Sequence, residues 1–292
     1  MLSDFIFEPP KKRKFIPKIK YSILKKIFLI KWFLLININY YLNILFSRNR
    51  KIVNNIFILS LSKNRPRKLE RLLNSINILS KKKDRIKILI LLDEDEKMKN
   101  DYVNIAEEFK KKKLDVNLYY KNFNQISEGY NFLARTVKQE GLFCLFSDDI
   151  IVTLNEWDEY IDFLSSKLSS EKAFSIWTRS NNHTERYYTH SEHPIVNSLW
   201  FKAVGYIDPP KLKNIPDLWI CELGRLSGNF IVSKKMIYNH LRADENPEEI
   251  DETYLNLKKK RQSENYNWHP KWIETTNERI KDAEKIKNFK KN

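Results

Sequence analysis

Short apolar segments alternate with amphipathic segments between residues 54 and 146, and this alternation limits the fold more than any other feature of the chain. The apolar segments, at 54–62, 85–92, 115–120 and 142–146, have the length and composition of buried strands. Between them, apolar residues recur at helical spacing in 66–76, 102–109 and 126–138, and Pro66 is well placed to open the first helix. The pattern predicts an α/β fold with a mostly parallel sheet flanked by helices and joined by right-handed crossovers.

Polar side chains follow each predicted strand. In parallel sheets, ligands bind beyond the carboxyl ends of the strands. A basic loop there suits phosphate, an acid suits a nucleobase, and a carboxylate pair suits a divalent cation. The residues at the four ends are Lys63, Asn64 and Arg65; Asp93, Glu94 and Asp95; Lys121 and Asn122; Asp148 and Asp149. We expect them to meet in one cleft.

Several common enzyme classes are excluded. With glycines at 129, 141, 205, 224 and 228 alone, neither a dinucleotide fingerprint nor a phosphate-binding P-loop can be written, and no His-Glu-x-x-His is present. Cys144 and Cys221 are too few and too far apart for a zinc module or a redox pair. This cysteine usage indicates a reducing compartment, so we expect a cytoplasmic protein.

Residues 1–51 read as a basic and apolar appendage. They hold twelve Lys and Arg against Asp4 and Glu8, a net charge of +10 out of +16 for the chain. Residues 27–46 are long enough to span a membrane, but Lys31 and three asparagines disfavour this. Two interpretations carry equal weight: association with a membrane surface through residues 1–51, and a helix packed on the main domain. No small-residue cleavage site follows, which argues against a signal peptide.

Three groups of residues carry a resemblance to a known family. They are an opening strand, Asn-Arg-Pro loop and helix (55–66, Leu69, 72–76); a helix leading to an acidic motif (126–131, Ala134, Gly141, 145–150); and a downstream group (193–196, 205–210, 217–220). Over about residues 54–235 they resemble the GT-A fold glycosyltransferases, specifically the family 2-like inverting enzymes. The resemblance implies a GT-A (nucleotide-diphospho-sugar transferase) domain over 52–250, followed by a charged helical tail over 251–292.

The same resemblance implies a hexosyltransferase-like enzyme that moves a sugar from a nucleotide-diphosphate donor to an acceptor hydroxyl on a glycan, lipid-linked molecule or protein. Such an enzyme would serve glycan or surface polysaccharide synthesis. Its cofactor would be Mn²⁺ or Mg²⁺, which neutralises charge on the departing diphosphate. Asp149 and Asp148 are the expected ligands, with His240 as the candidate to complete the site; a satisfied surface or core histidine is the competing interpretation of His240. The family's usual motif is Asp-x-Asp, and Ser147 departs from it.

The resemblance also assigns donor and acceptor residues. Ser62 and Arg65 would face the nucleotide, Asp93 would hydrogen-bond its base, and Asp148 would contribute to donor binding. Asn131 and Arg135 would touch phosphate or ribose. The competing interpretations are a turn residue at the end of a strand for Asp93 and a solvated helix face for Arg135. Inversion needs a general base on the acceptor side, and Asp217 matches that position, with Glu222 as the fallback. Helix N-capping is the competing role of Asp217.

Two further segments have weaker signals. Residues 179–192 are polar and aromatic without a period, which favours an acceptor or lid loop; its His183 and His190, with the following His193, lack metal-helix spacing. Residues 251–292 alternate charges at helical spacing, which predicts a solvated helix. Asp251-Glu252-Thr253-Tyr254 is similar to a motif of some such transferases, and we assign it no chemistry.

Other functions compete with glycosyl transfer. Ser147 leaves room for a nucleotidyltransferase or for a degenerate sugar- or nucleotide-binding relative. The basic appendage alone suggests a protein that binds membranes or nucleic acid. Residues 52–292 carry a net charge of just +6, so nucleic acid is the weaker of these two partners.

Overall fold

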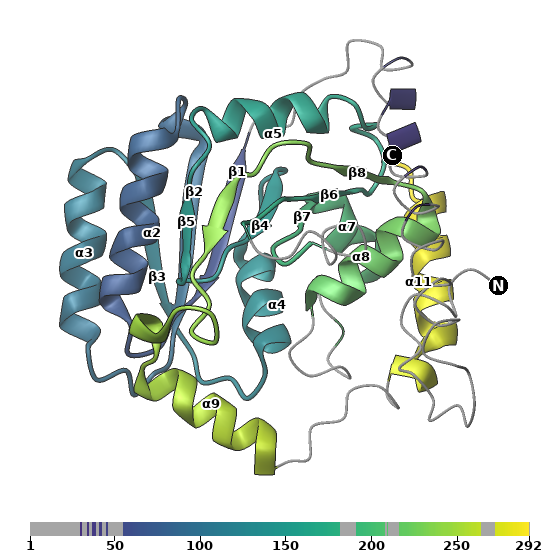
Figure 1. Ribbon diagram of the computed structural model, residues 1–292. Coiled ribbons are helices and arrows are strands. Elements are labelled where there is room, and N and C mark those ends of the chain that lie inside the picture. The colour runs from purple at the N-terminus through teal and green to yellow at the C-terminus, as the bar shows by residue number, and fades with distance from the viewer. Residues whose placement is uncertain are drawn as a thin grey trace.

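The computed structural model describes residues 55–181, 191–207, 209, 216–263 and 272–291, together with positions 30, 34, 37, 38, 41, 42 and 45. Within them a seven-stranded sheet has the order β3-β2-β1-β4-β7-β6-β8 (Figure 1). Its strands are β1 (Ile56–Leu61), β2 (Ile86–Leu92), β3 (Asp115–Tyr120), β4 (Leu142–Leu145), β6 (Ser175–Trp177), β7 (Ile195–Asn197) and β8 (Phe230–Val232). The first four are parallel, whereas β7 runs antiparallel to both β4 and β6. The predicted α/β class with a mostly parallel sheet is confirmed.

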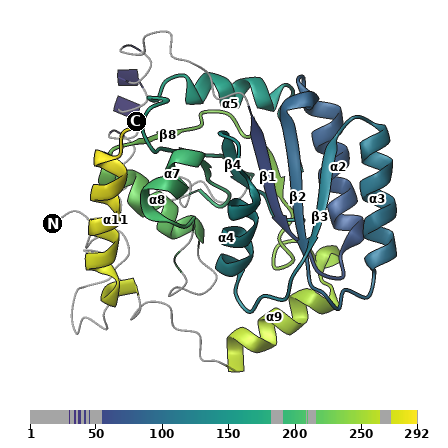
Figure 2. The same ribbon diagram turned by 180° about the vertical axis from the view of Figure 1, so that it is seen from behind.

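Two hydrophobic cores lie on opposite faces of this sheet, because successive side chains of a strand point to opposite sides. Ile56 and Ile58 of β1 pack with α2 (Pro66–Leu79), α3 (Lys99–Lys111) and α5 (Trp157–Ser165). Phe57 and Leu59 pack on the other side. The helices of that side are α4 (Ile126–Thr136), α7 (Ser198–Val204), α8 (Pro216–Ser227) and α11 (Thr276–Asn288) (Figure 2).

A second, small sheet pairs β5 (Ile150–Val152) antiparallel with β9 (Tyr238–His240). β5 follows directly on Asp148 and Asp149, so the pairing brings His240 next to the acidic motif: Ile150 lies opposite His240 in the register. The sequence pattern predicts a strand at 229–233 before His240, but it does not predict β9. This short strand is what carries His240 to the carboxyl end of β4.

The charge pattern of the C-terminal segment predicts a solvated helix, and the described side chains of α9 (Glu252–Ser263) are exposed or half-exposed, whereas α11 differs from the prediction. On α11, Ala283 and Ile286 are buried in the core that α8 also lines. Arg279 is buried as well, and its guanidinium lies 3.9 Å from the ring centre of Trp272 and 5.8 Å from that of Trp219 on α8. Apolar and cation–π contacts on one narrow face of α11 therefore pack this helix against the domain, although its sequence alternates charges.

Seven positions of the N-terminal appendage are described, and all are helical. Ile30, Leu34, Ile38 and Leu42 recur every four residues, and each is between 47% and 60% exposed. On the domain, Lys234 hydrogen-bonds the Asn37 side chain. The rest of the appendage lies outside the described residues. Among the residues that are described, no helix combines the length and the apolar character needed to cross a bilayer.

A buried ion cluster fastens α5 to the edge of the first core. Arg85 donates to Asp162 Oδ1 at 2.8 Å and to the backbone oxygen of Asp158 at 2.9 Å. Asp158 is fully buried and accepts hydrogen bonds from the backbone N–H groups of Lys81 and Lys82, at 2.9 and 3.0 Å. The cluster therefore joins the turn before β2 to the first turns of α5.

Arg85→Leu is expected to lower the free energy of unfolding by about 3 kcal/mol, because it leaves two buried carboxylates without their cation. Urea unfolding followed by circular dichroism measures this. Lys81→Leu is the matched control, since the Lys81 ammonium pairs with Glu159 at the surface and exposed pairs contribute little. Equal losses in the two variants would contradict a role for the buried cluster.

Candidate active site

The first loop, residues 62–65 after β1, is held in place by a buried tyrosine. Tyr102 of α3 is fully buried; its hydroxyl accepts a hydrogen bond from the Arg65 backbone N–H at 2.8 Å and contacts Ser62 Oγ at 2.8 Å. Burial raises the pKa of Tyr102 above its ordinary value, so the phenol stays neutral. This contact fixes the start of α2 and presents Lys63, Asn64 and Arg65 at the carboxyl edge of the sheet.

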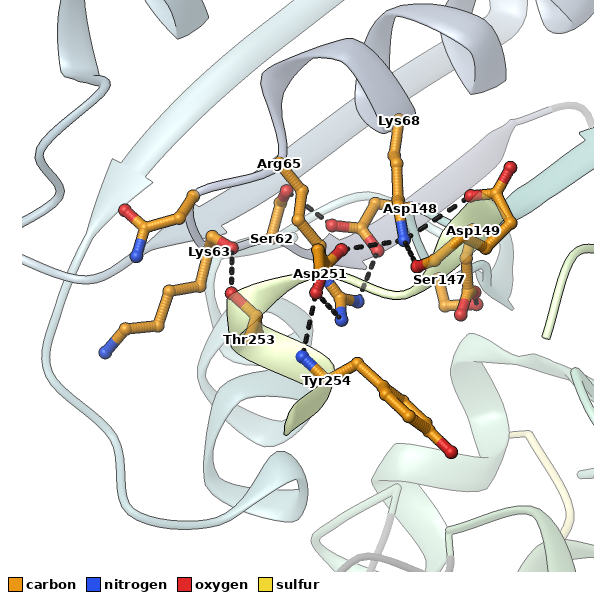
Figure 3. Close-up of polar contacts among 12 residues, drawn as sticks. Ser62, Lys63, Arg65, Lys68, Ser147, Asp148, Asp149, Asp251, Thr253 and Tyr254 are labelled. Atoms are coloured by element: carbon orange, nitrogen blue, oxygen red, sulfur yellow. Dashed lines mark hydrogen bonds and ion pairs between the residues drawn. The ribbon is translucent and has the colours of Figure 1, made fainter. Parts of the chain in front are cut away.

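The two aspartates after β4 point to different partners (Figure 3). Asp148 is buried; its Oδ2 accepts from Ser62 Oγ at 2.6 Å and its Oδ1 lies 3.5 Å from Arg65 Nη1. Burial, with the adjacent Asp149 charge, raises the pKa of Asp148 to about 6. Asp149 accepts a hydrogen bond from Ser147 and faces the β9 histidine instead. One aspartate thus belongs to the first loop and the other to β9.

Asp149, His240 and Glu192 form a chain of contacts. His240 Nε2 lies 3.4 Å from Asp149 Oδ1, and its Nδ1 lies 3.1 Å from Glu192 Oε2. Arg242 Nη2 approaches the other Glu192 oxygen at 3.4 Å. Burial opposes the charged form of His240, but the two carboxylates outweigh it and raise the pKa of His240 to about 9. Glu192 therefore fixes the ring so that Nε2 faces Asp149.

His193 completes this cluster from β7's edge. Its Nδ1 lies 2.8 Å from the Leu145 carbonyl oxygen and its Nε2 lies 3.4 Å from Ser147 Oγ. The His193 and His240 ring centres are 4.9 Å apart. Burial lowers the pKa of His193 to about 4, which keeps the ring neutral. Sequence reasoning missed Glu192 and His193 as site residues, although His193-Pro194 belongs to the downstream group of the resemblance; His183 and His190 lie outside the described residues.

Asp217 lies in the first turn of α8 and is half-buried. Burial raises the pKa of Asp217 to about 7, and the negative charge of Glu192 acts in the same direction against a hydrogen bond from the Leu218 backbone. Glu192 and Arg242 are thus the charged side chains that act on the Asp217 carboxyl group. The fallback residue Glu222 is buried farther along α8 and pairs with Arg225 at 2.8 Å.

The other predicted donor residues divide into two groups. Asp93 is buried at the end of β2 and forms an ion pair with Lys63, so it joins the first loop. Asn131 is buried and accepts a hydrogen bond from the Ile207 backbone N–H at 2.7 Å, which gives it a structural partner. Arg135 is exposed in the last turn of α4, and α4 runs from the carboxyl edge of the sheet towards the start of β4. The structure thus does not bring Arg135 to the site.

No group of three or more His, Cys, Asp or Glu side chains is arranged to hold a metal ion among the residues that the structure describes. Asp149 and His240 nevertheless present two donor atoms to each other, as given above. Both oxygens of Asp148 are engaged elsewhere.

Comparison with solved structures decides the fold. TarS 1–349 of S. aureus in complex with UDP matches the chain with a TM-score of 0.51 at 16% identity, over 63% of this chain and 60% of that one. The mannosyltransferase PcManGT from Pyrobaculum calidifontis, in complex with GDP-Man and Mn²⁺, gives a TM-score of 0.55 at 10% identity, over 75% of this chain and 67% of that one. The chain has the GT-A glycosyltransferase fold.

The GT-A fold confirms the predicted resemblance at the level of architecture. A third structure, TarS 1–349 in complex with UDP-GlcNAc, matches with a TM-score of 0.51 at 16% identity over 63% of this chain and 58% of that one. The chain thus spans about 60% of the length of the TarS 1–349 chains. No protein-family model and no curated protein matches its sequence.

Proposed function

We propose that the chain is a metal-dependent, inverting glycosyltransferase that moves a sugar from a nucleoside-diphosphate donor to an acceptor hydroxyl. The observation that carries this proposal is the position of Asp149 and His240, which lie 3.4 Å apart at the carboxyl end of β4. GT-A architecture supports it, and so do the neighbours, whose structures hold UDP, UDP-GlcNAc or GDP-Man.

The donor set of Asp149 and a neutral His240 fits a divalent cation, which would displace the proton from His240 Nε2 on binding. Two ligands of one octahedral ion lie about 3 Å apart, and Asp149 Oδ1 and His240 Nε2 are separated by 3.4 Å. When bound, the cation would neutralise charge on the leaving diphosphate. Two protein ligands suffice where phosphate oxygens and water supply the others, which is the usual arrangement for Mg²⁺ with phosphate substrates. Asp148 is better assigned to the donor side, because Ser62 and Arg65 hold both of its oxygens.

Donor binding is assigned to the first loop. Arg65 and Lys63 supply positive charge there, while Asp93 and Asp148 are the acceptors that a base or ribose could use. Arg135 lies outside this set, since it is exposed at the other end of α4.

Asp217 is the proposed general base. With a pKa near 7, its carboxylate can accept a proton from the acceptor hydroxyl without being fully protonated at neutral pH. As that proton leaves, the acceptor oxygen forms a bond to the anomeric carbon while the bond to the diphosphate oxygen breaks on the opposite face. Glu192 holds the His240 ring, and its charge also acts on Asp217. Glu192 therefore links the proposed metal ligands to the proposed base.

A donor screen tests the proposal. The full chain is incubated with Mn²⁺ and a panel of UDP- and GDP-sugars, and nucleoside diphosphate release is measured. We expect release with one donor, dependent on metal. Consumption of nucleoside triphosphate with pyrophosphate release would instead identify a nucleotidyltransferase. Nucleotide binding without turnover, in the presence of glycan acceptors, would identify a degenerate relative.

We also propose that the appendage attaches this enzyme to an anionic membrane surface. The support is the row of half-exposed apolar side chains at 30, 34, 38 and 42, together with the net charge of +10 over residues 1–51. An apolar helical row beside basic residues is typical of helices that lie in the lipid interface.

Vesicle sedimentation tests this attachment. The full chain is expected to bind phosphatidylglycerol-containing vesicles more strongly than phosphatidylcholine vesicles. Ile38→Ser is expected to reduce the binding about threefold or more, because the variant lacks an apolar side chain that would become buried in the lipid. Ile78→Ser is the matched control, because Ile78 is an isoleucine 65% exposed on α2. Equal binding by the wild type and Ile38→Ser would contradict membrane attachment through this row.

A further inference from the structure

Asp251 closes an ion-pair network over the first loop (Figure 3). Its Oδ1 accepts a hydrogen bond from Arg65 Nη2 at 2.9 Å, and its Oδ2 lies 2.7 Å from Lys68 Nζ. Asp251 lies 186 positions beyond Arg65 in the chain. Two cations from the start of α2 therefore converge on one carboxylate, as they would on a phosphate group.

The residues around Asp251 are fastened to the same region by polar contacts. Glu249 accepts two hydrogen bonds from Arg71, at 2.6 and 2.8 Å, and Lys68 donates to its backbone oxygen at 2.7 Å. Thr253 Oγ1 donates to the Lys63 backbone oxygen at 3.0 Å. The segment from 249 to 253 thus lies over the loop that we assign to the donor.

Helix α9 (Glu252–Ser263) begins at this network and has little else to hold it. The Asp251 side chain accepts from the Tyr254 backbone N–H at 2.8 Å, which is the geometry of a helix N-cap. Among the described side chains of α9, each is exposed or half-exposed, and Leu255 remains 45% exposed. No apolar packing within this described part anchors α9, so the charged contacts at its first turn set its position.

We propose that Asp251 is a built-in anion that occupies the cations of the donor site, and that α9 is a lid which a nucleoside diphosphate releases. This inference rests on the proposed function. A diphosphate carries more negative charge than a carboxylate, and it would compete for the same Arg65 and Lys68 side chains. The Asp251 side chain is 27% exposed, so it can move into solvent when a phosphate group takes its place.

This exchange has a structural consequence for Arg65. Its other contact, Asp148 Oδ1 at 3.5 Å, remains when Asp251 leaves, so the guanidinium stays at the carboxyl edge while one side of it becomes free. Displacement of Asp251 would leave α9 with its N-cap, while Glu249 would keep the preceding turn attached to Arg71 of α2. The lid therefore moves as a helix and does not need to unfold.

Asp251→Asn tests the proposal, because asparagine is as good an N-cap as aspartate but carries no charge. Binding of UDP and GDP to the full chain is measured by calorimetry, and hydrogen exchange is followed over residues 249–258. We expect the variant to bind at least one of the two about fivefold more tightly than the wild type, since the competing anion is gone. Nucleotide should also speed exchange of this segment in the wild type, towards the rate of the unliganded variant.

Glu248→Gln is the control, since Glu248 is an exposed acid of the same turn and its replacement changes the net charge equally. It should leave both nucleotide affinity and exchange unchanged. If the wild type binds nucleotide and Asp251→Asn binds equally or more weakly, Asp251 positions Arg65 and the lid proposal is wrong. Slower exchange of the segment with nucleotide would overturn it as well. If neither protein binds either nucleotide, both the lid and the proposed function fail.

Discussion

Asp217→Asn is expected to reduce glycosyl transfer by about 10³-fold, a loss typical of removing a general base. The same change should leave nucleotide binding to the first loop nearly intact, because Asp217 lies on α8, and the charges that shift its pKa are those of Glu192 and Arg242, which lie outside the first loop. For the wild type, kcat/KM should fall about tenfold per pH unit below pH 7, since the base must be deprotonated and burial raises the pKa of Asp217 to about 7. A pH–rate profile with the identified donor measures both effects.

The free energy of unfolding of the wild type should fall as the pH rises towards 7, whereas its activity should rise. The pKa of Asp217 is raised in the folded chain from an ordinary value of 3.8 to about 7, so its favourable contribution is complete below pH 4 and is lost as the pH rises to 7. Above pH 7 the folded chain holds a half-buried charge that asparagine lacks. Asp217→Asn is therefore expected to raise the free energy of unfolding at pH 8 by about 1–3 kcal/mol, and by much less at pH 5.

Urea unfolding at the two pH values measures this difference. Asp101→Asn is the matched control, because Asp101 lies in the first turn of α3 and is exposed. A gain that is the same at pH 5 and pH 8 would show that the effect does not come from the titration of Asp217. A gain in stability together with full activity would reject Asp217 as the base.

Asp149→Asn is expected to weaken Mn²⁺ binding by about 100-fold and to reduce transfer by about 10³-fold, because it replaces a charged oxygen ligand by a neutral one. Electron paramagnetic resonance of free Mn²⁺ measures the binding without any requirement for turnover. UDP and GDP binding in the absence of metal should remain within about twofold of the wild type, since Asp149 contacts Ser147 and His240 and not the first loop.

Asp148→Asn is the informative comparison for this prediction. Asp148 contacts Ser62 and Arg65, so we expect its replacement to weaken nucleotide binding while leaving Mn²⁺ binding nearly unchanged. The opposite pattern, with Mn²⁺ binding lost in Asp148→Asn and kept in Asp149→Asn, would mean that the side chains exchange roles when metal binds. It would reject the assignment of Asp149 and His240 as the metal ligands.

The first half of the fold was predictable because its strands are local and strong. β1 and β2 are nearly continuous runs of Ile and Leu, and each is followed by a polar turn and an amphipathic helix. Their carboxyl ends could be placed at one edge by topology alone, and the structure brings Asp93 and Asp148 to the first loop as expected. Local pattern and sheet geometry were enough for this half.

The second half depends on pairings that no local pattern contains. β6, β7, β8 and β9 are three residues each, too short for a period to be recognised. β7 and β9 nevertheless decide the site, because they bring His193 and His240 to Asp149 from far along the chain. Glu192 was missed for the same reason: its significance comes from contacts with His240 and Arg242 across 48 and 50 positions, and not from its neighbours.

The contacts of Arg279 join α8, which carries Asp217, to the C-terminal helix α11. Arg279 lies over the rings of both Trp272 and Trp219, and Trp219 is two residues from Asp217 on the same helix. Tyr206, next to the Ile207 that Asn131 holds, also hydrogen-bonds Asp282 of α11. α11 therefore stabilises the proposed acceptor half of the domain, whereas α9 begins over the proposed donor loop. A protease cut or a truncation near the C-terminus would thus uncouple acceptor use from donor binding, producing a protein that recognises its nucleotide but transfers poorly.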